Sequence, residues 1–482
     1  MAPTLSFKHA GILYCTAFLV RAIVMIFLIQ PNGFFKQADS VDYHNCAVSI
    51  AAGNGMHRID TQEPIFWRTP GYPPYLAFFY RMCGMNSPRF EDNKTAQLLS
   101  IWLQIILASS IPIILFFLAG ILTQTLTIAY ALAWIGVFHP GLALASSYLL
   151  TEGLALIFFY FFLLCFFYAL LSEHKKISFI SLLGAAFSLS IYTWIRPMGE
   201  YIGLLSFIIL WLASYGSWTQ KTARGLLFAF LFFGSLLPWY TRNYQLTGEW
   251  FFCPTIGTYL NCFSVPKILR RTLNKPIEEC HKIAQMNGGR ATYQKRLRLR
   301  GTGKHVSNNV CKEVAYPIVK TYPWFFIYDW IAETIKTTFD LYGYQLIPMI
   351  DGSYWHDPIE EYLPEKISAC LWAHEMPWYG RTICWIEFLF SLFLWIGLLG
   401  GFWIFVLQAI ITKKIQPPFS YSLLKTWIVS ILMIGITIGM TGGFGYARLR
   451  LPAEPLMLIL SLTFWYWLYY RIYKLTPPKD NR

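Results

Sequence analysis

The chain has 482 residues, of which 56% are hydrophobic and only 13% are charged, and its formal net charge is +14. Soluble proteins carry roughly 25% charged residues, so a soluble globule of this size is excluded, as are a disordered chain and a small disulfide scaffold. The composition instead predicts an all-α polytopic membrane protein with sizeable parts outside the bilayer. Lys and Arg in the loops of such a chain orient the helices and contact anionic lipid, so the positive charge does not indicate a nucleic-acid partner.

Apolar segments almost free of charged residues indicate about ten membrane spans. The first, residues 11–30, is interrupted only by Arg21 and is too long to be a removed signal peptide. Residues 96–151 contain no charged residue and fit two spans and a short surface segment after His139. The other spans are expected in residues 153–172, 177–195, 201–219, 225–241, 388–412, 426–447 and 455–470.

The short apolar stretch of residues 71–79 decides the orientation of the chain. Its length and its flanking prolines favour an interfacial helix, and the short Lys- and Arg-rich loops then all fall on the cytoplasmic side. Both termini are therefore expected inside, and residues 31–95 and 242–381 outside. The predicted units are a transmembrane module of residues 1–241 with a catalytic first outer loop, an outer segment of mixed helix and loop in residues 242–381, and C-terminal helices in residues 382–482.

The outer segment carries a basic stretch in residues 290–304 and an aromatic amphipathic stretch near Tyr322 to Phe326. A solvated face near lipid headgroups explains the basic stretch more simply than recruitment of an anionic substrate. The ten cysteines form no CxxC pair, so no zinc ribbon or redox motif is supported, while one or two disulfides are compatible with an oxidising compartment.

Charged side chains near the membrane are costly to keep and are therefore candidates for function. Asp39 and Asp42 follow the first span, and their spacing places both carboxylates on one face if the segment is helical. One of them can then act as a general base. The alternative is that Asp39 or Ser40 only caps a helix that ends at Gly53.

Three further charged residues also allow both a functional and a structural interpretation. Glu152 begins a span, where it serves a site or is a first-turn acid stabilised by the helix dipole. Arg68 lies among aromatic residues at headgroup depth, where it grips a phosphate or extends to lipid. Arg196 lies four residues before Glu200, which is also the spacing of a simple ion pair on one helix.

The orientation set by the loops places these groups at one outer face, together with Arg242, Arg448 and Arg450. Carboxylates among guanidinium groups suit a base beside an anionic lipid headgroup. The sequence contains no HExxH motif, P-loop or Rossmann fingerprint that would indicate another chemistry.

At these residues the chain resembles the GT-C superfamily of polyprenyl-phosphate-sugar-dependent glycosyltransferases, in the branch of protein O-mannosyltransferases and lipid A aminoarabinose transferases. The resemblance covers most of the membrane portion and consists of short motifs in a fixed order. They are Asp39, Asp42 and Tyr43, Gly53, residues 68–73, Pro140, residues 151–152, residues 196–197, residues 238–243 and residues 448–452.

This resemblance implies a GT-C type helical bundle with juxtamembrane helices on the outer face, and inverting transfer of a sugar from a polyprenyl phosphate to a hydroxyl. Asp39 would be the catalytic base, with Asp42 as the alternative. The residues expected to contact substrate are Asp42, Tyr43, Arg68, Glu152, Arg196, Arg242, Arg448 and Arg450. Arginines would stabilise the leaving phosphate, so no metal or other cofactor is expected.

The acceptor would be a lipid, a glycan or a protein, and the compartment the bacterial inner membrane with the site on the periplasmic side. Two other classes stay open. A transporter or flippase of a lipid-linked or anionic solute would carry charge within its spans and broken inverted repeats, whereas only Arg21 lies within a span. A non-catalytic membrane scaffold would leave the acids and arginines without a task.

Overall fold

The structure is a computed structural model of the whole chain. It describes residues 4–254 except 32, 34, 38, 60, 61 and 86, and beyond them residues 260, 264–274, 276, 279–280, 295–298, 305–308, 312–342, 378–407, 421–441 and 447–473. Residues 343–377 of the expected outer segment and the glycine-rich turn of residues 442–445 lie outside these ranges.

A long first helix leads to two short ones. Helix α1 (Phe7–Ile23) is capped by Ser6 and continues as a π-helix over Val24–Ile29. Helices α2 (Ser40–Ala51) and α3 (Tyr72–Met82) follow and pack against each other. Eleven residues make α3 roughly 17 Å long, which is too short to cross a bilayer and agrees with the expected interfacial helix.

Four apolar helices fill the segment that contains no charged residue. Helices α4 (Lys94–Ala108) and α5 (Ile111–Thr123) follow one another, and α5 ends where Gln124 adopts a left-handed conformation. Helices α6 (Leu126–Phe138) and α7 (Pro140–Ser147) meet at a bend of 47°. The bend lies at Pro140 because proline cannot continue the preceding helix and favours the first turn of the next.

Helices α8 (Thr151–Leu171) and α9 (Lys175–Ile195) form a long hairpin and pack along each other. Each has 21 residues, which corresponds to about 31 Å, close to the thickness of a bilayer core. The start of α8 and the end of α9 therefore lie at one membrane face, and the Lys-bearing loop between them lies at the other.

A second hairpin consists of α10 (Gly199–Ala213) and α11 (Trp218–Thr247). Ser217 and Gln220 form a capping box at the start of α11, which satisfies two backbone N–H groups. The helix ends at Gly248, whose φ of 82° suits glycine.

The described part of the outer segment contains helices α13 (Val265–Leu273), α16 (Lys312–Thr321) and α17 (Pro323–Phe339). Strands β1 (Lys295–Arg298) and β2 (His305–Asn308) pair in antiparallel fashion. The expected segment of mixed helix and loop thus also contains one short pair of strands, the first of which lies in the basic stretch.

The C-terminal part contains α20 (Trp378–Leu407), α21 (Tyr421–Thr441) and α22 (Glu454–Tyr473), with a 3₁₀ turn at Ala447–Leu449 before the last helix. Helix α22 packs against α20 and α21 and also contacts α5 and α6. One continuous core of buried apolar side chains thereby joins the N-terminal and C-terminal helices.

Within the described residues, six helical stretches are long and apolar enough to cross a membrane, and the bent pair α6 and α7 would be a seventh. Helix α10 and residues 425–440 of α21 are apolar but shorter. Each of the expected spans coincides with a helix, yet fewer than ten reach the required length and hydropathy, because α10 has only 15 residues and α22 is rich in Trp and Tyr. The chain is an integral membrane protein of mainly helical fold.

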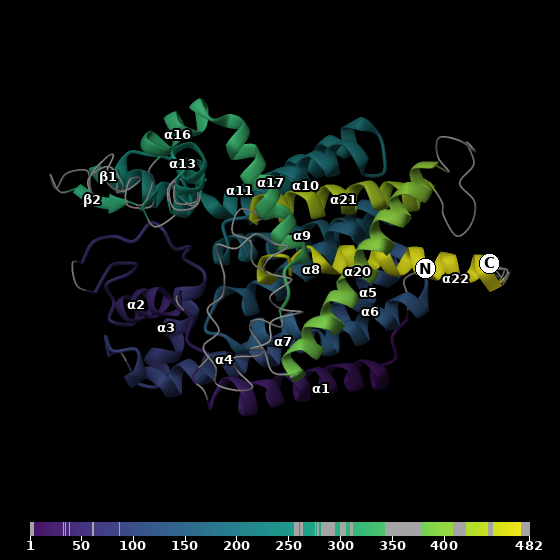
Figure 1. The fold of residues 1–482 in the computed structure, drawn as a ribbon, viewed down its shortest axis with the longest axis horizontal. Coiled ribbons are helices and arrows are strands. Elements are labelled where there is room, and N and C mark those ends of the chain that lie inside the picture. The colour runs from purple at the N-terminus through teal and green to yellow at the C-terminus, as the bar shows by residue number, and fades with distance from the viewer. Residues whose placement is uncertain are drawn as a thin grey trace.

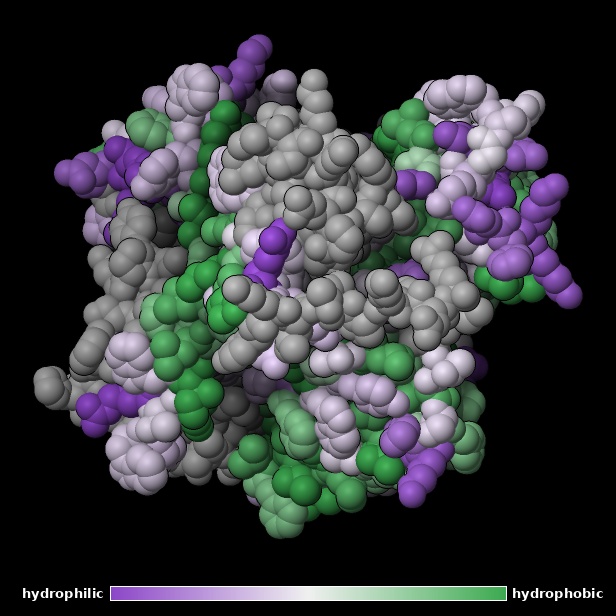
Figure 2. All heavy atoms as spheres, turned by 90° about the vertical axis from the view of Figure 1, so that its right-hand side faces the viewer, coloured by the Kyte–Doolittle hydropathy of each residue, from purple (hydrophilic) through white to green (hydrophobic). Residues whose placement is uncertain are grey.

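The two ends of the bundle differ. Helices α2, α3, α13 and α16 and both strands gather at one end of the long helices, whereas α1 begins and α22 ends at the opposite end (Figure 1). Figure 2 looks onto that opposite end, where hydrophobic side chains spread over the flanks and hydrophilic ones form separate groups. Helices of the first expected outer segment and of the second therefore lie at the same end of the molecule.

Candidate active site

Arg68 joins the two acids that follow the first span. Its Nη2 donates to Asp39 Oδ1 at 2.8 Å and to Asp42 Oδ2 at 2.7 Å, and its Nε donates to Asp42 Oδ2 at 3.2 Å. Asp39 occupies the N-cap position of α2 but its side chain makes no capping hydrogen bond, so the capping alternative was wrong. Both carboxylates remain 45% exposed, while the Arg68 side chain is 19% exposed. The arginine is thus held in place and the acids stay open to a ligand.

Tyr43 lies under this cluster and connects it to a second one. The Arg68 guanidinium is 4.9 Å from the centre of the Tyr43 ring, and its Nη1 lies 3.4 Å from the Tyr43 hydroxyl. Burial raises the pKa of Tyr43 above its ordinary value, although Arg68 opposes the shift, and Glu152 and Arg196 also act on it. The phenol therefore stays protonated and can donate a hydrogen bond.

The second cluster is centred on Glu152 in the first turn of α8. Glu152 Oε1 pairs with Arg196 Nη1 at 3.0 Å and lies 3.8 Å from Arg448 Nε, and Glu152 Oε2 accepts from the Thr151 hydroxyl at 3.2 Å. Arg196 follows the end of α9 and pairs with this carboxylate, so the alternative of a pair with Glu200 was wrong. Two guanidinium groups around one carboxylate leave the cluster with an excess positive charge.

The segment that carries Arg68 is docked directly on the end of α9. Thr69 Oγ1 donates to the Ile195 carbonyl at 2.6 Å, and the Gly71 N–H donates to the Trp194 carbonyl at 2.8 Å. A Cβ atom on Gly71 would lie 2.6 Å from the Trp194 carbonyl, so only glycine fits. This contact fixes Arg68 relative to the helix that presents Arg196.

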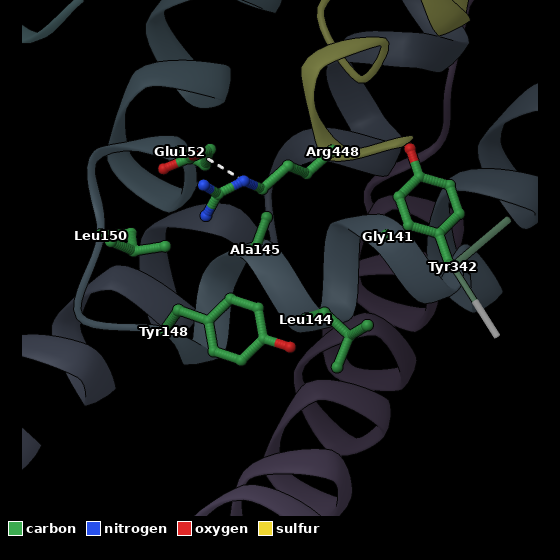
Figure 3. Close-up of a pocket in the computed structure, with 8 residues that line it drawn as sticks. All are labelled: Gly141, Leu144, Ala145, Tyr148, Leu150, Glu152, Tyr342 and Arg448. Atoms are coloured by element: carbon green, nitrogen blue, oxygen red, sulfur yellow. Dashed lines mark ion pairs between the residues drawn. The ribbon is translucent and has the colours of Figure 1, made fainter. Parts of the chain in front are cut away.

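A small pocket opens beside Glu152 (Figure 3). Arg448 reaches across it to Glu152 from the turn before α22, while Tyr148 and Tyr342 flank it (Figure 3). Its volume is about 10 Å³, enough for roughly one water molecule. The complete lining consists of Gly141, Leu144, Ala145, Tyr148, Leu150, Glu152, Tyr342 and Arg448.

Arg242 lies apart from both clusters. Its Nη1 donates to the Ile65 carbonyl at 3.2 Å and to Asn243 Oδ1 at 2.8 Å, and its guanidinium lies 4.4 Å from the Trp239 ring centre. These contacts hold the loop before Arg68 against α11. In the structure, Arg242 therefore stabilises the loop that carries Arg68.

Arg450 is also separate, in a buried polar group near the bend between α6 and α7. Its Nε pairs with Glu454 Oε1 at 2.6 Å, and Glu454 also accepts from the Tyr342 hydroxyl at 3.0 Å. His139 Nε2 lies 3.1 Å from Glu454 Oε2. Arg450 and Glu454 are four residues apart on the chain, a spacing that could have suggested this pair. No nearby sequence pattern could have indicated His139 and Tyr342 as further partners of Glu454.

Among the described residues, no group of three or more His, Cys, Asp and Glu side chains is arranged to hold a metal ion. Asp60, which lies near two histidines in the sequence, is outside the described residues. Of the cysteines that the structure describes, Cys15, Cys46, Cys83, Cys165 and Cys384 are free thiols. Cys262, Cys311 and Cys370, which also belong to the expected outer side, fall outside the described residues.

Neither a protein-family model nor a curated protein matches the sequence. The fold is similar to that of the Archaeoglobus fulgidus oligosaccharyltransferase, with a TM-score of 0.50 and 13% identity over 97% of this chain. This chain spans about half of that protein, 52% of its length. ArnT from Cupriavidus metallidurans bound to undecaprenyl phosphate is more distant, with a TM-score of 0.38, 11% identity, and coverage of 93% of this chain and 78% of that one.

The chain has the GT-C type of fold. The expected all-α membrane bundle is thus confirmed, since the described helices follow this architecture from α1 to α22. Within this fold, the Arg68 cluster and the Glu152 cluster come from four separated segments: the loop before α3, α2, the α8–α9 hairpin and the turn before α22.

Proposed function

We propose that this protein is a membrane glycosyltransferase that moves a sugar from a polyprenyl-phosphate donor to an acceptor hydroxyl with inversion. The observation that carries the proposal is the pair of adjoining clusters of opposite excess charge. Asp39 and Asp42 share one arginine, whereas Glu152 lies between two. Tyr43 contacts Arg68 of the first cluster, and Glu152 and Arg196 of the second act on its hydroxyl electrostatically.

The positive cluster suits the donor phosphate. Arg448 lies 3.8 Å from Glu152 and is the more exposed arginine, with 27% of its side chain exposed against 19% for Arg196. Arg196 is held closer to the same carboxylate and supplies a fixed positive field. As the bond between the anomeric carbon and the phosphate oxygen breaks, the charge that develops on the phosphate is stabilised by these guanidinium groups.

The negative cluster suits the acceptor. Asp39 accepts the proton of the acceptor hydroxyl while the oxygen of that hydroxyl forms the new bond to the anomeric carbon. Asp42 shares the Arg68 guanidinium and is the alternative base. Attack on the side opposite the leaving phosphate inverts the anomeric centre. The acceptor is a lipid, a glycan or a protein that presents such a hydroxyl, and the membrane lipids are the further partner.

The site is proposed to face the periplasm of a bacterial inner membrane, with both termini in the cytoplasm. The Lys175 and Lys176 loop lies about one bilayer thickness away from Glu152, which agrees with the positive-inside rule. In this arrangement residues 1–241 form the catalytic module, residues 242–381 the outer segment and residues 382–482 the closing helices.

The test is sugar transfer in proteoliposomes from a panel of undecaprenyl-phosphate-linked sugars. Asp39→Asn is expected to lower the transfer rate by roughly 10²–10⁴-fold, the usual contribution of a general base. Glu91→Gln is the matched control, because Glu91 is an exposed acid of the same expected outer loop and is paired with Lys36.

If Asp39→Asn transfers sugar at the normal rate and Asp42→Asn loses transfer, Asp42 is the general base. Activity in both variants would refute the mechanism. A flippase of a lipid-linked solute would instead translocate the donor without breaking its sugar–phosphate bond, which analysis of the recovered lipid detects.

A further inference from the structure

Helix α17 turns an apolar stripe outward. Trp324 is 78% exposed, Tyr328 is 55% exposed, and Ile331 and Ile335 are 46% and 45% exposed. Spacings of three and four residues place these side chains on one face of the helix. The aromatic stretch that the sequence singles out is thus the start of a continuous exposed stripe.

The polar face of the same helix points inward. Asp329 and Lys336 are buried, and Asp329 pairs with Arg271 of α13 at 2.8 Å. Glu333 pairs with Lys267 of α13 in the same way. The helix therefore has the opposite arrangement to a surface helix in water, which hides its apolar stripe and exposes its polar face.

Lipid is the occupant that this inverted arrangement fits. Exposed apolar surface of this kind is unfavourable in water, whereas acyl chains are as apolar as the stripe. Helix α17 also packs beside a span, because Trp330, on another face of the helix, donates from Nε1 to the Gly439 carbonyl in the apolar part of α21. Trp and Tyr at its N-terminal half suit the interface between headgroups and acyl chains.

The other end of α17 is hydrogen-bonded to the turn that carries Arg448 and Arg450. Arg450 Nη1 donates to the carbonyls of Thr338 at 2.6 Å and Asp340 at 3.0 Å, at the C-terminus of the helix. A cation at this end also interacts favourably with the helix dipole. Arg450 lies two residues after Arg448 and is itself fixed by Glu454.

We propose that α17 is a lipid-embedded arm whose outer stripe contacts the bilayer and whose C-terminus, through Arg450, positions the turn that presents Arg448 to Glu152. Arg450 and Glu454 are then positioning residues. The idea that Arg448 acts on substrate rests on the proposed function. The contact of α17 with lipid and the coupling of α17 to the turn through Arg450 do not, and both are measured without sugar transfer.

The lipid contact is tested by photo-crosslinking in phospholipid vesicles. p-Benzoylphenylalanine is placed in turn at Trp324, Tyr328, Ile331 and Ile335, with Phe230 of α11 as a 75% exposed reference on a span and Arg270 as an exposed polar position on α13. Phospholipid adducts are expected at the four stripe positions at levels near that of Phe230, and at least about fivefold above Arg270. Crosslinks from the four stripe positions to protein would overturn the proposed lipid contact. The absence of any adduct at these positions, while Phe230 reacts with lipid, would also overturn it.

The coupling is tested by hydrogen exchange in nanodiscs. The reporters are the amides of Ala453 and Glu454, which donate to the Arg450 carbonyl. The double variant Tyr328→Ser, Ile331→Ser is expected to raise their exchange rates by about tenfold or more, as is Arg450→Lys. The control Phe230→Ser should leave these rates unchanged.

Faster exchange confined to α17, with Ala453 and Glu454 at wild-type rates, would show that the arm is not coupled to the turn. If the double variant fails to fold, Tyr328→Ser alone is compared in the same way, and wild-type rates at both amides again overturn the proposal. Failure of sugar transfer in any variant bears only on the proposed function.

Discussion

Arg68 shows how one side chain decides between the structural and the functional interpretation of a local pattern. The sequence allowed Asp39 to be a helix cap and Arg68 to extend toward lipid. Instead the guanidinium takes both Asp39 and Asp42 as partners, and its plane faces the Tyr43 ring. A planar fork with several donors can serve two carboxylates at once, which a lysine cannot do in the same geometry.

The two arginines around Glu152 are expected to respond differently to substitution. Arg448→Gln should weaken binding of undecaprenyl phosphate by about tenfold or more, because a charged hydrogen bond contributes roughly 1.5–3 kcal/mol, and should lower stability less than Arg196→Gln does. Arg196→Gln should lower stability by about 3–5 kcal/mol, because it leaves the buried Glu152 without its nearest cation. Lipid binding and thermal unfolding, measured on both variants, separate the two roles.

If Arg448→Gln lowers the melting temperature as much as Arg196→Gln does, the proposal that Arg448 binds the substrate is wrong. Arg224→Gln serves as the control, since Arg224 is a half-buried arginine near the start of α11, and its described hydrogen bond is the one from Nη1 to the Tyr215 carbonyl at 2.9 Å.

His44 gives a prediction for pH. Burial lowers its pKa below the ordinary value, against the opposing effect of the Pro88 carbonyl, while its ring lies 2.8 Å from the Tyr80 hydroxyl. Because the folded state holds the neutral ring, its contribution to stability is complete above about pH 6.5 and is lost as the pH falls toward the lowered pKa. The melting temperature should therefore drop between pH 7.5 and pH 5.5, and the drop should be smaller in His44→Gln. Equal drops would show that other groups carry the effect.

At the scale of elements, the docking of the Arg68 loop on the end of α9 brings the two clusters together. Gly71 makes this contact possible, because a Cβ atom would meet the Trp194 backbone. Gly71→Ala should cost about 1–3 kcal/mol through overpacking and should lower sugar transfer by displacing Arg68 from Arg196. The control is Gly234→Ala in α11, where nothing lies within 4 Å of the added atom.

Gly234→Ala should leave both stability and transfer unchanged or slightly raise stability, since alanine favours a helix over glycine. Thermal unfolding and the transfer assay are measured together on both variants. Wild-type transfer in a folded Gly71→Ala protein would mean that the spacing of the clusters does not control the reaction.

The α8–α9 hairpin explains why residues 44 positions apart form one ion pair. Two antiparallel helices of equal length return the chain to the face from which it started, so that Glu152 at the start of α8 meets Arg196 after the end of α9. Equal length is set by the bilayer, which requires about 20 apolar residues for each crossing.

At the scale of the whole molecule, the arrangement predicts sidedness. Cysteine placed at the exposed His174, between α8 and α9, should react with a membrane-impermeant maleimide only from the cytoplasmic side. Cysteine placed at the exposed Arg89, before α4, should react only from the opposite side. Labelling in sealed right-side-out and inverted vesicles checks both, and reaction of both positions from one side would refute the topology.

The sequence by itself determined the class of protein, the positions of most helices and the residues worth testing. Long charge-free segments in a chain this apolar have no alternative to membrane helices, and the few charges near their ends stand out for the same reason. The shortness of α3 and the end of a helix before Pro140 also followed from local chemistry, because proline and segment length act within a few residues.

Only the tertiary structure decided which charges meet. Asp39 with Arg68, Glu152 with Arg196, and Arg450 with the end of α17 are contacts between segments far apart in the chain, and no local spacing encodes them. The same holds for Arg242, which the packing assigns to a supporting loop, and for α17, whose polar face is turned inward by its pairing with α13. Helix formation is local, whereas the choice of ion-pair partners depends on how the helices pack.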